Sequence, residues 1–258
     1  MRAPTQSNLF NRQQFVNGSE TSPVIAMAFF SRRPPERVIH DKQVWGQPDF
    51  AAEYNSQVCK YNVDFQPILD YLSSQIDPAR QVNVLEIGPG PGWIGIRLAQ
   101  SHPAVRVTGI DISAAFVAIA NENSHREGVA DRVTFTLGDA AEMKGLTDNS
   151  FDVVFSFQSL HYWDPPERVF DQIARVLKPS GVLCIGEDRR DMNWQGKLQV
   201  LLGRFFLSRR IASVWARSVV GCLTPAEAAD ALQRSGLRDR WQIAIRPRAM
   251  LITSKPRE

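Results

Sequence analysis

Between residues 79 and 258, short apolar runs alternate with stretches of helical periodicity. The first five runs are almost continuously apolar and cover residues 83–87, 106–110, 133–137, 152–157 and 182–185. Strands that are buried on both faces read as continuous apolar runs, and strands that alternate with helices pair in parallel. The pattern therefore predicts a parallel sheet with helices on both of its faces.

The intervening stretches predict helices over residues 94–100, 114–127 and 166–177, with a further helix over 224–235. Thr224, Pro225 and Glu227 are typical of an N-cap, a first helical position and a capping box. Two last strands, 242–245 and 249–253, are separated only by Arg246-Pro247-Arg248, which is short enough to make them antiparallel neighbours. We expect a doubly wound, Rossmann-like α/β fold with seven strands, five parallel and two in a terminal antiparallel hairpin.

Three further segments flank or interrupt this pattern. Residues 1–35 are rich in Asn, Gln, Ser and Pro and are predicted to be a poorly ordered leader. Residues 36–78 have aromatic side chains at helical spacing from about Glu36, which predicts cap helices before a main domain over 79–258. Residues 191–221 form a helical insertion in that domain, and no apolar run reaches the 18 to 20 or so residues of a membrane span.

The composition favours a small-molecule partner. The chain has 258 residues, 43% of them apolar, and a net charge of +3, which is close to balance and disfavours a dedicated nucleic-acid binder. Cys59, Cys184 and Cys222 have no metal-ligand spacing and leave an odd thiol, so a reduced, cytoplasmic protein without a structural metal is expected. Cys184 lies in an apolar run and is predicted to be a core residue.

The loop after the first strand reads VLEIGPGPGWIG, and its glycines fit two patterns. Counted from Gly90 they match the G-x-G-x-x-G of a dinucleotide site, whereas Gly88, Gly90 and Gly92 make an overlapping G-x-G-x-G. In either pattern the glycines allow a tight turn and let a ligand approach a helix N-terminus. Glu86 would repel a pyrophosphate and suits a ligand with a cationic ammonium group, although the loop alone leaves both possibilities open.

Acidic residues also end the second and third strands. Asp111 in VTGIDIS can accept both hydroxyl groups of a ribose, and Asp139 in TLGDA can accept from an adenine amino group. Ligands of open α/β sheets bind at the carboxyl edge near the switch in strand order. Glu86, Asp111 and Asp139 are therefore expected to converge on one cleft that binds an adenosine-type cofactor.

The ordered motifs VLEIGPGPG, VTGIDIS, FTLGDAAEM, FDVVFSFQSLHYW and LKPSGVLCIGE resemble the class I S-adenosylmethionine-dependent methyltransferases, in particular their small-molecule, type 11-like branch. The resemblance covers about residues 82–185 and implies S-adenosylmethionine as the cofactor. It places Gly88, Gly90 and Gly92 along the methionyl part, with Glu86 orienting the ammonium group directly or through water. The remaining roles that it implies are Asp111 on the ribose, Ile112, Asp139 and Ala140 around the adenine, and Phe157 and Gln158 at the methionyl end.

His161 is the candidate general base for the acceptor, because histidine ordinarily titrates near neutrality and this one follows the fourth strand. The alternative is that it only packs or caps the loop. Tyr54, Tyr61, Trp163 and Asp188 are expected around the substrate. The Asn/Asp-Pro-Pro-Tyr/Phe signature of family members that methylate amino groups is missing, and Glu187, Asp188, Asp191 and Asn193 do not reproduce the metal-dependent pattern, so no metal is expected.

The prediction is methyl transfer to a small aromatic or lipophilic metabolite, with oxygen favoured over carbon or sulfur. An RNA methyltransferase and a protein or enzyme that binds S-adenosylmethionine without methyl transfer are the alternatives. Residues 197–217 hold five basic and no acidic residues among apolar ones, which is typical of a lid helix or of peripheral contact with an anionic membrane. The sequence makes no prediction of the oligomeric state.

Overall fold

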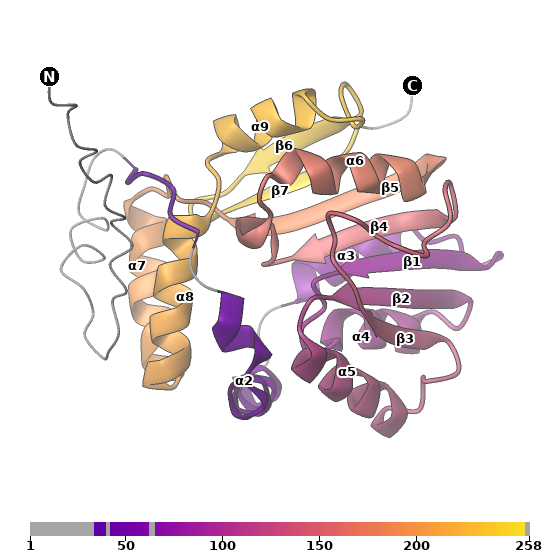
Figure 1. Cartoon of the computed structure of the whole chain (residues 1–258), viewed down its shortest axis with the longest axis horizontal. Coiled ribbons are helices and arrows are strands. Elements are labelled where there is room, and N and C mark those ends of the chain that lie inside the picture. Colours follow the sequence, from indigo (N-terminus) through magenta and orange to yellow (C-terminus); the bar gives the residue numbers. More distant parts are fainter. Residues whose placement is uncertain (1–33, 40–41, 62–64, 256–258) are drawn as a thin grey trace, which may run out of the picture.

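The computed structural model describes residues 34–39, 42–61 and 65–255, and a seven-stranded sheet forms its centre (Figure 1). The strand order is β3-β2-β1-β4-β5-β7-β6. The parallel strands are β1 (Val82–Ile87), β2 (Val105–Asp111), β3 (Val133–Leu137), β4 (Phe151–Phe157) and β5 (Leu177–Asp188), and the antiparallel pair is β6 (Trp241–Ile245) and β7 (Ala249–Ser254). The predicted doubly wound sheet with its terminal hairpin is confirmed.

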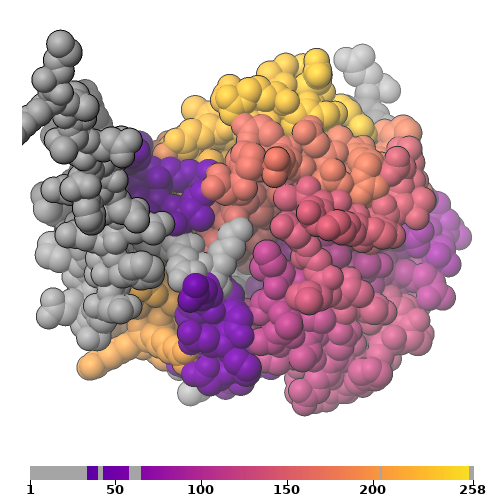
Figure 2. All heavy atoms as spheres, in the orientation of Figure 1, coloured from indigo at the N-terminus to yellow at the C-terminus, as the bar shows by residue number. Residues whose placement is uncertain are grey.

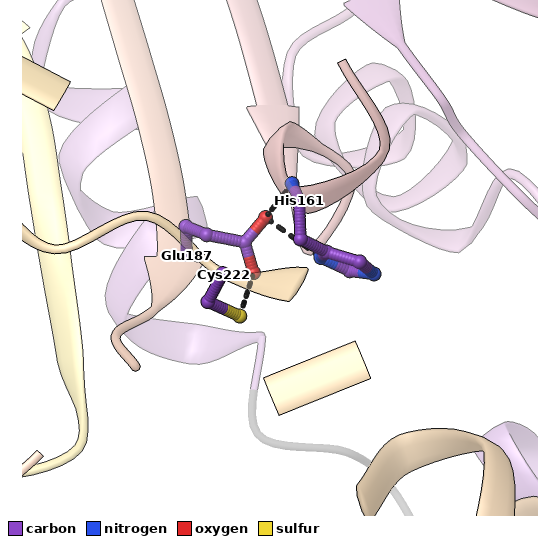
Figure 3. A group of neighbouring side chains, drawn as sticks. All are labelled: His161, Glu187 and Cys222. Carbon is purple, nitrogen blue, oxygen red and sulfur yellow. Dashed lines mark hydrogen bonds and ion pairs between the residues drawn. The ribbon is translucent and has the colours of Figure 1, made fainter. Parts of the chain in front are cut away.

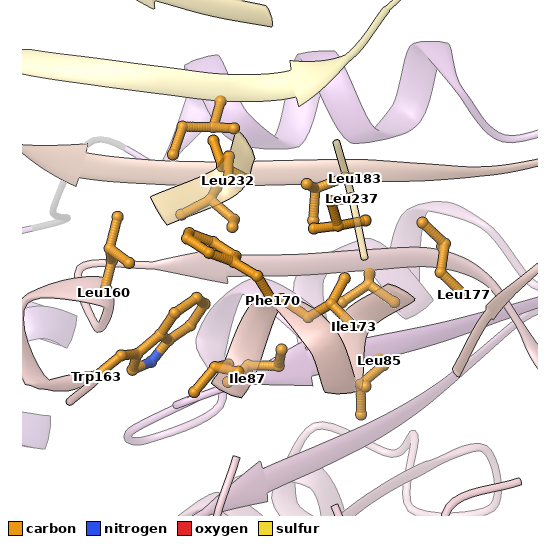
Figure 4. Packing of buried hydrophobic residues seen from close by; sticks show 14 of the residues in the cluster. Leu85, Ile87, Leu160, Trp163, Phe170, Ile173, Leu177, Leu183, Leu232 and Leu237 are labelled. Carbon is orange, nitrogen blue, oxygen red and sulfur yellow. The ribbon is translucent and has the colours of Figure 1, made fainter. Parts of the chain in front are cut away.

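Helices cover both faces of this sheet. Helices α3 (Gln66–Ser74), α4 (Trp93–Ser101) and α5 (Ala114–Arg126) pack on one face, and α6 (Pro166–Val176) and α9 (Pro225–Gln233) pack on the other. Side chains of β1 alternate between the two cores: Val84 faces the first layer, and Leu85 and Ile87 face the second, as expected for a strand buried on both sides. Figure 4 shows the second core, where Phe170 of α6 meets Leu232 of α9.

Strand β5 begins earlier than the apolar run predicts. Leu177 pairs with Phe151, and regular pairing resumes at Val182 opposite Val153 after a shift in register. The Lys-Pro-Ser-Gly segment, residues 178–181, lies within the strand at this irregularity. The chain therefore enters the sheet directly from the end of α6.

The cap consists of η1 (Lys42–Gly46), α2 (Pro48–Tyr61) and α3, and the insertion consists of α7 (Trp194–Gly203), η3 (Arg204–Phe206) and α8 (Arg209–Gly221). One part of the cap, η1 and α2, packs against the insertion, whereas α3 packs on the sheet. Helix α2 lies between α5 and α8 (Figure 2), where Phe50 packs on Ile211 and Val214.

Two predictions for the cap meet the structure differently. Residues 34–39 form no helix, so the helical stretch predicted from Glu36 starts only at Lys42. All but the last two residues of the predicted leader, 1–35, lie outside the described residues. Within the described ranges, no helix combines the length and the apolar character that crossing a bilayer requires.

Candidate active site

The loop between β1 and α4 has left-handed backbone at Gly88, Gly90 and Gly92, with φ of 65°, 53° and 81°. A Cβ atom on Gly88 would lie 2.6 Å from the Cβ of Ser159, and one on Gly92 would lie 2.6 Å from the ring of Phe135. A Cβ on Gly90 would meet nothing within 4 Å. Gly88 and Gly92 are therefore required for packing, whereas Gly90 borders open space that a ligand can approach.

Asp111, at the end of β2, is fixed against this loop. Its Oδ2 accepts a hydrogen bond from the Gly90 amide at 3.0 Å, and its Oδ1 accepts one from the Ser113 amide at 2.9 Å. Burial raises the pKa of Asp111, and these amides partly oppose the rise because they favour the charged form. Each oxygen keeps a further acceptor site, which suits a ribose diol.

The three residues that were predicted to surround an adenine, Ile112, Asp139 and Ala140, border the same cavity as Asp111. Ile112 is exposed, although it is a large apolar side chain. Asp139 is exposed and accepts the Ala141 amide at 2.8 Å, which leaves its second oxygen available, and Ala140 follows it. An exposed apolar surface beside a free carboxylate oxygen suits a heterocycle with an amino group.

Glu86 is buried without a complete set of partners. Its side chain is 2% exposed, its Oε2 has no hydrogen-bond partner within the described chain, and burial raises its pKa well above the ordinary value. A Cβ on Gly95 would collide with this carboxylate, so the first turn of α4 admits Glu86 only because residue 95 is glycine. Glu86 borders the cavity, and buried carboxylates are normally paired, so a carboxylate with an oxygen that has no partner among the described residues fits a cationic ligand group such as an ammonium.

One cavity of about 620 Å³ joins the glycine loop to the cap and the insertion. The sequence-predicted residues that border it are Tyr54, Glu86, Gly88, Gly90, Asp111, Ile112, Asp139, Ala140, Phe157, Gln158, His161, Trp163 and Asp188. Gly92 faces the Phe135 ring, and its place along a ligand stays a prediction. The side chain of Tyr61 lies outside the described part of the chain.

Aromatic side chains from the cap and the insertion enclose the cavity beyond the glycine loop. The Trp45 indole nitrogen donates to the Tyr162 hydroxyl at 2.7 Å, and the Trp45 ring meets the Tyr54 ring edge-on at 5.5 Å. The Ser113 hydroxyl donates to the Trp45 carbonyl at 2.6 Å, which ties this wall to the turn after Asp111. The part of the cavity beyond the glycine loop, which we call the acceptor half, is therefore largely aromatic. It is held against the part around the glycine loop, which we call the cofactor half.

His161 lies in a buried network at the carboxyl ends of β4 and β5 (Figure 3). Its Nδ1 is 3.0 Å from Oε2 of Glu187, which also accepts the His161 amide at 3.1 Å. Oε1 of Glu187 accepts the Asp188 amide at 3.0 Å and the Cys222 thiol at 3.8 Å. Glu187 accepts from three other donors, so we assign the Nδ1 hydrogen to this contact. In that tautomer Nε2, which is buried and has no hydrogen-bond partner among the described residues, is the nitrogen without hydrogen.

His161, Glu187 and Cys222 are the group of potential metal ligands found among the described residues, and their ligand atoms lie within 4.8 Å of one another. Burial raises the pKa of the Cys222 thiol well above its ordinary value, and a metal site would require the thiolate. Asp191, considered with Glu187 from the sequence, turns away and pairs with Arg189 through both oxygens. The contacts therefore describe a hydrogen-bonded network.

Two other predicted pocket residues have additional roles. Trp163 is 5% exposed and packs edge-on against Phe170 at 5.6 Å (Figure 4), so most of its surface belongs to the core. Asp188 is 1% exposed and accepts from the Arg248 Nε at 3.0 Å and the Trp215 Nε1 at 3.2 Å. Its carboxylate is therefore already occupied by protein donors.

Four features of the site were not predicted from the sequence: Arg248, Trp215, Trp45 and the contact by which Glu187 orients His161. A signal for Arg248 was available, because the tip of an antiparallel hairpin that pairs with β5 lies at the carboxyl edge of the sheet, where Ala249 opposes Asp188. Trp45 and Trp215 stood in helical patterns that give no indication of which aromatic side chains face a cavity.

The comparisons with known proteins agree with this geometry. Residues 85–185 match the family described as "Methyltransferase domain". Residues 85–185 are therefore a methyltransferase domain of this family. S-adenosylmethionine is the cofactor of this family, and the orphaned Glu86 oxygen and the fixed Asp111 carboxylate of this methyltransferase domain fit the ammonium and ribose groups that the cofactor carries.

Two relatives and one solved structure illustrate the similarity. The 27-O-demethylrifamycin SV methyltransferase of Amycolatopsis mediterranei is 34% identical over 56% of this chain and 53% of its own length. The sterol 24-C-methyltransferase of Gibberella zeae is 32% identical over 45% of this chain and 30% of its own. An O-methyltransferase family protein from Burkholderia thailandensis shares the fold with a TM-score of 0.62 and 19% identity, covering 90% of this chain and 67% of that one. The chain thus spans about half or less of the length of these two relatives.

Proposed function

We propose that this methyltransferase domain acts on a hydroxyl oxygen of a small apolar or aromatic metabolite, with His161 as general base. The observation that carries the proposal is His161, which borders the cavity that begins at the glycine loop and whose buried Nε2 has no hydrogen-bond partner among the described residues. A general base must be within reach of the proton that it removes, and a single cavity brings cofactor and acceptor to the same ring.

Each acidic side chain of the cofactor half has a proposed role. Glu86 would pair with the ammonium group of S-adenosylmethionine, Asp111 with its ribose hydroxyls and Asp139 with its adenine amino group. Gly88 and Gly90 would lie along the methionyl chain, and Phe157 and Gln158 would close on it. When bound, the cofactor supplies a methyl group on a cationic sulfur.

In the acceptor half, His161 and Glu187 manage the proton. The bare Nε2 would accept the hydroxyl proton of the substrate, and the Glu187 carboxylate would stabilise the imidazolium that forms while it keeps the ring oriented. Trp45, Tyr54 and Tyr162 would exclude water and hold an apolar acceptor. We take oxygen as the acceptor atom because a hydroxyl must lose a proton on methylation, which gives the base a role.

The relatives support small-molecule methyl transfer in general and leave the acceptor atom to experiment, since both O- and C-methyltransferases are among them. Incubation with S-adenosylmethionine that carries a deuterated methyl group and a panel of phenols and lipophilic alcohols tests the proposal by mass spectrometry. We expect label on oxygen. Label on carbon alone, or binding of cofactor without transfer to any acceptor, would overturn it.

A peripheral membrane contact through residues 197–217 is part of the proposal. Trp194, Leu198, Leu202 and Phe205 are between 44% and 80% exposed along α7 and η3, and Val200 packs inward. No acidic residue lies between Asp191 and Glu227. An apolar outer face with basic neighbours is typical of helices that lie on anionic membranes. The cytoplasmic location expected from the cysteines also remains a prediction.

A further inference from the structure

Arg248 is the only lysine or arginine on the cavity wall among the residues that the structure describes. It lies at the tip of the β6–β7 hairpin, on the acceptor side, and its side chain is 36% exposed. Glu86, Asp111 and Asp139 are the acidic residues of the cofactor half. The acceptor half therefore contains one permanent cation, whose partners indicate what it can bind.

Two contacts fix the guanidinium, and a third joins its two partners. Its Nε donates to Asp188 Oδ1 at 3.0 Å, and its central carbon lies 5.8 Å from the centre of the Trp215 ring. The Trp215 indole nitrogen donates to the other Asp188 oxygen at 3.2 Å. Asp188, buried at the end of β5, thus orients a cation and an indole from two distant elements.

The backbone beneath Arg248 is held equally closely. Its carbonyl accepts the Arg189 amide at 2.9 Å, and the Pro247 carbonyl accepts the Asn193 amide at 3.2 Å. A Cβ on Gly196 would lie 2.8 Å from the Cα of Arg248, so α7 approaches the hairpin tip only because that residue is glycine. The side chain is therefore presented from a rigid support.

The two terminal nitrogens of Arg248 have no hydrogen-bond partner within the described chain, whereas Nε does. A guanidinium presents its terminal N–H groups as a planar fork that matches a carboxylate with two parallel hydrogen bonds. The Asp188 charge does not oppose such a ligand strongly, since it is shared among Arg248, Trp215 and the Gln158 side chain. We propose that the terminal nitrogens of Arg248 bind a carboxylate on the methyl acceptor, so that the substrate is an aromatic or lipophilic acid.

This inference rests on the proposed function, and calorimetry separates the two. The protein is first saturated with S-adenosylhomocysteine and then titrated with hydroxylated aromatic acids of one to three rings, each beside its methyl ester. We expect at least one acid to bind about tenfold more tightly than its ester, because the ester cannot form the charged bidentate pair. Failure to bind S-adenosylhomocysteine would refute the proposed function, whereas its binding without any acid preference would refute only this inference.

Variants locate the preference. Arg248→Gln is expected to bind acid and ester equally, Arg248→Lys to keep part of the preference because it retains charge without the fork, and Arg246→Gln, an exposed neighbour outside the cavity, to behave as wild type. The affinity for S-adenosylhomocysteine and the melting temperature of each variant report whether the fold is intact. An acid preference that survives Arg248→Gln in a folded protein would overturn the assignment.

Discussion

Replacing Glu86 by Gln is expected to stabilise the cofactor-free protein and to weaken cofactor binding. The Glu86 carboxylate is buried, has one oxygen without a partner among the residues that the structure describes, and has a raised pKa caused chiefly by desolvation. A carboxyl group with a raised folded-state pKa destabilises the fold as pH rises above the ordinary carboxyl pKa of about 4, until it passes the folded-state value. The variant should therefore gain stability relative to wild type over that interval and match it below.

The magnitudes follow from the buried charge. The Gln amide keeps a polar atom in the same place, so the gain in stability comes from removing the desolvated charge. Each tenfold change in the proton affinity of the Glu86 carboxylate on folding corresponds to about 1.4 kcal/mol, and for a chain of this size 1 kcal/mol corresponds to roughly 2–4 °C in melting temperature. The bond that Glu86 would form with an ammonium is charge-assisted and worth about 1.5–3 kcal/mol, so the Kd of S-adenosylhomocysteine should rise about 10- to 150-fold in the variant.

Thermal melts of the cofactor-free proteins from about pH 4 to about pH 8 test the first effect, and titration calorimetry tests the second. Glu142→Gln is the matched control, because Glu142 is an exposed acid paired with Lys144 and does not border the cavity. The reasoning is refuted if Glu86→Gln binds S-adenosylhomocysteine as tightly as wild type, or if its stability relative to wild type does not change with pH.

Further predictions concern the base, the network around it and the insertion. His161→Gln should lower kcat at least about 100-fold and Glu187→Gln by a smaller factor, with the affinity for S-adenosylhomocysteine unchanged in both variants. Stopped turnover assays with a saturating acceptor measure these effects. An unaffected kcat for His161→Gln would assign the ring to packing. Treatment with EDTA should leave turnover unchanged, because the Cys222 thiol stays protonated; activity lost to EDTA and restored by zinc would contradict the hydrogen-bonded network. The wild-type chain should sediment with anionic vesicles at low salt, and the Phe205→Asp variant should sediment less. No sedimentation of the wild type, or equal sedimentation with zwitterionic vesicles, would count against the membrane contact.

The sheet was predictable because its signal is local. Each central strand is a short apolar run, and the capping box at Thr224 and Glu227 is present with both of its hydrogen bonds. The start of β5 was not predictable in this way, because Leu177 joins the sheet by pairing with Phe151 across a register shift that its neighbours in sequence do not indicate.

The cofactor half of the site was largely predictable, since its acidic residues end consecutive strands that must meet at one edge. The acceptor half depends on contacts between distant segments. Arg248 meets Asp188 across 60 residues, and Trp45 meets Tyr162 across 117. At Gly92, which the motif also includes, a Cβ atom would collide with the ring of Phe135, so packing alone is a sufficient reason for the glycine.

The most direct test of the account is a calorimetric titration with S-adenosylhomocysteine of the wild-type protein and of Asp111→Ala, beside a titration with a nicotinamide dinucleotide. Asp111 holds the glycine loop through the Gly90 amide and borders the cavity, so its loss should abolish cofactor binding. The account predicts one S-adenosylhomocysteine per wild-type chain, none for Asp111→Ala and no binding of the dinucleotide. Binding of the dinucleotide alone, or an unchanged affinity in Asp111→Ala, would contradict it.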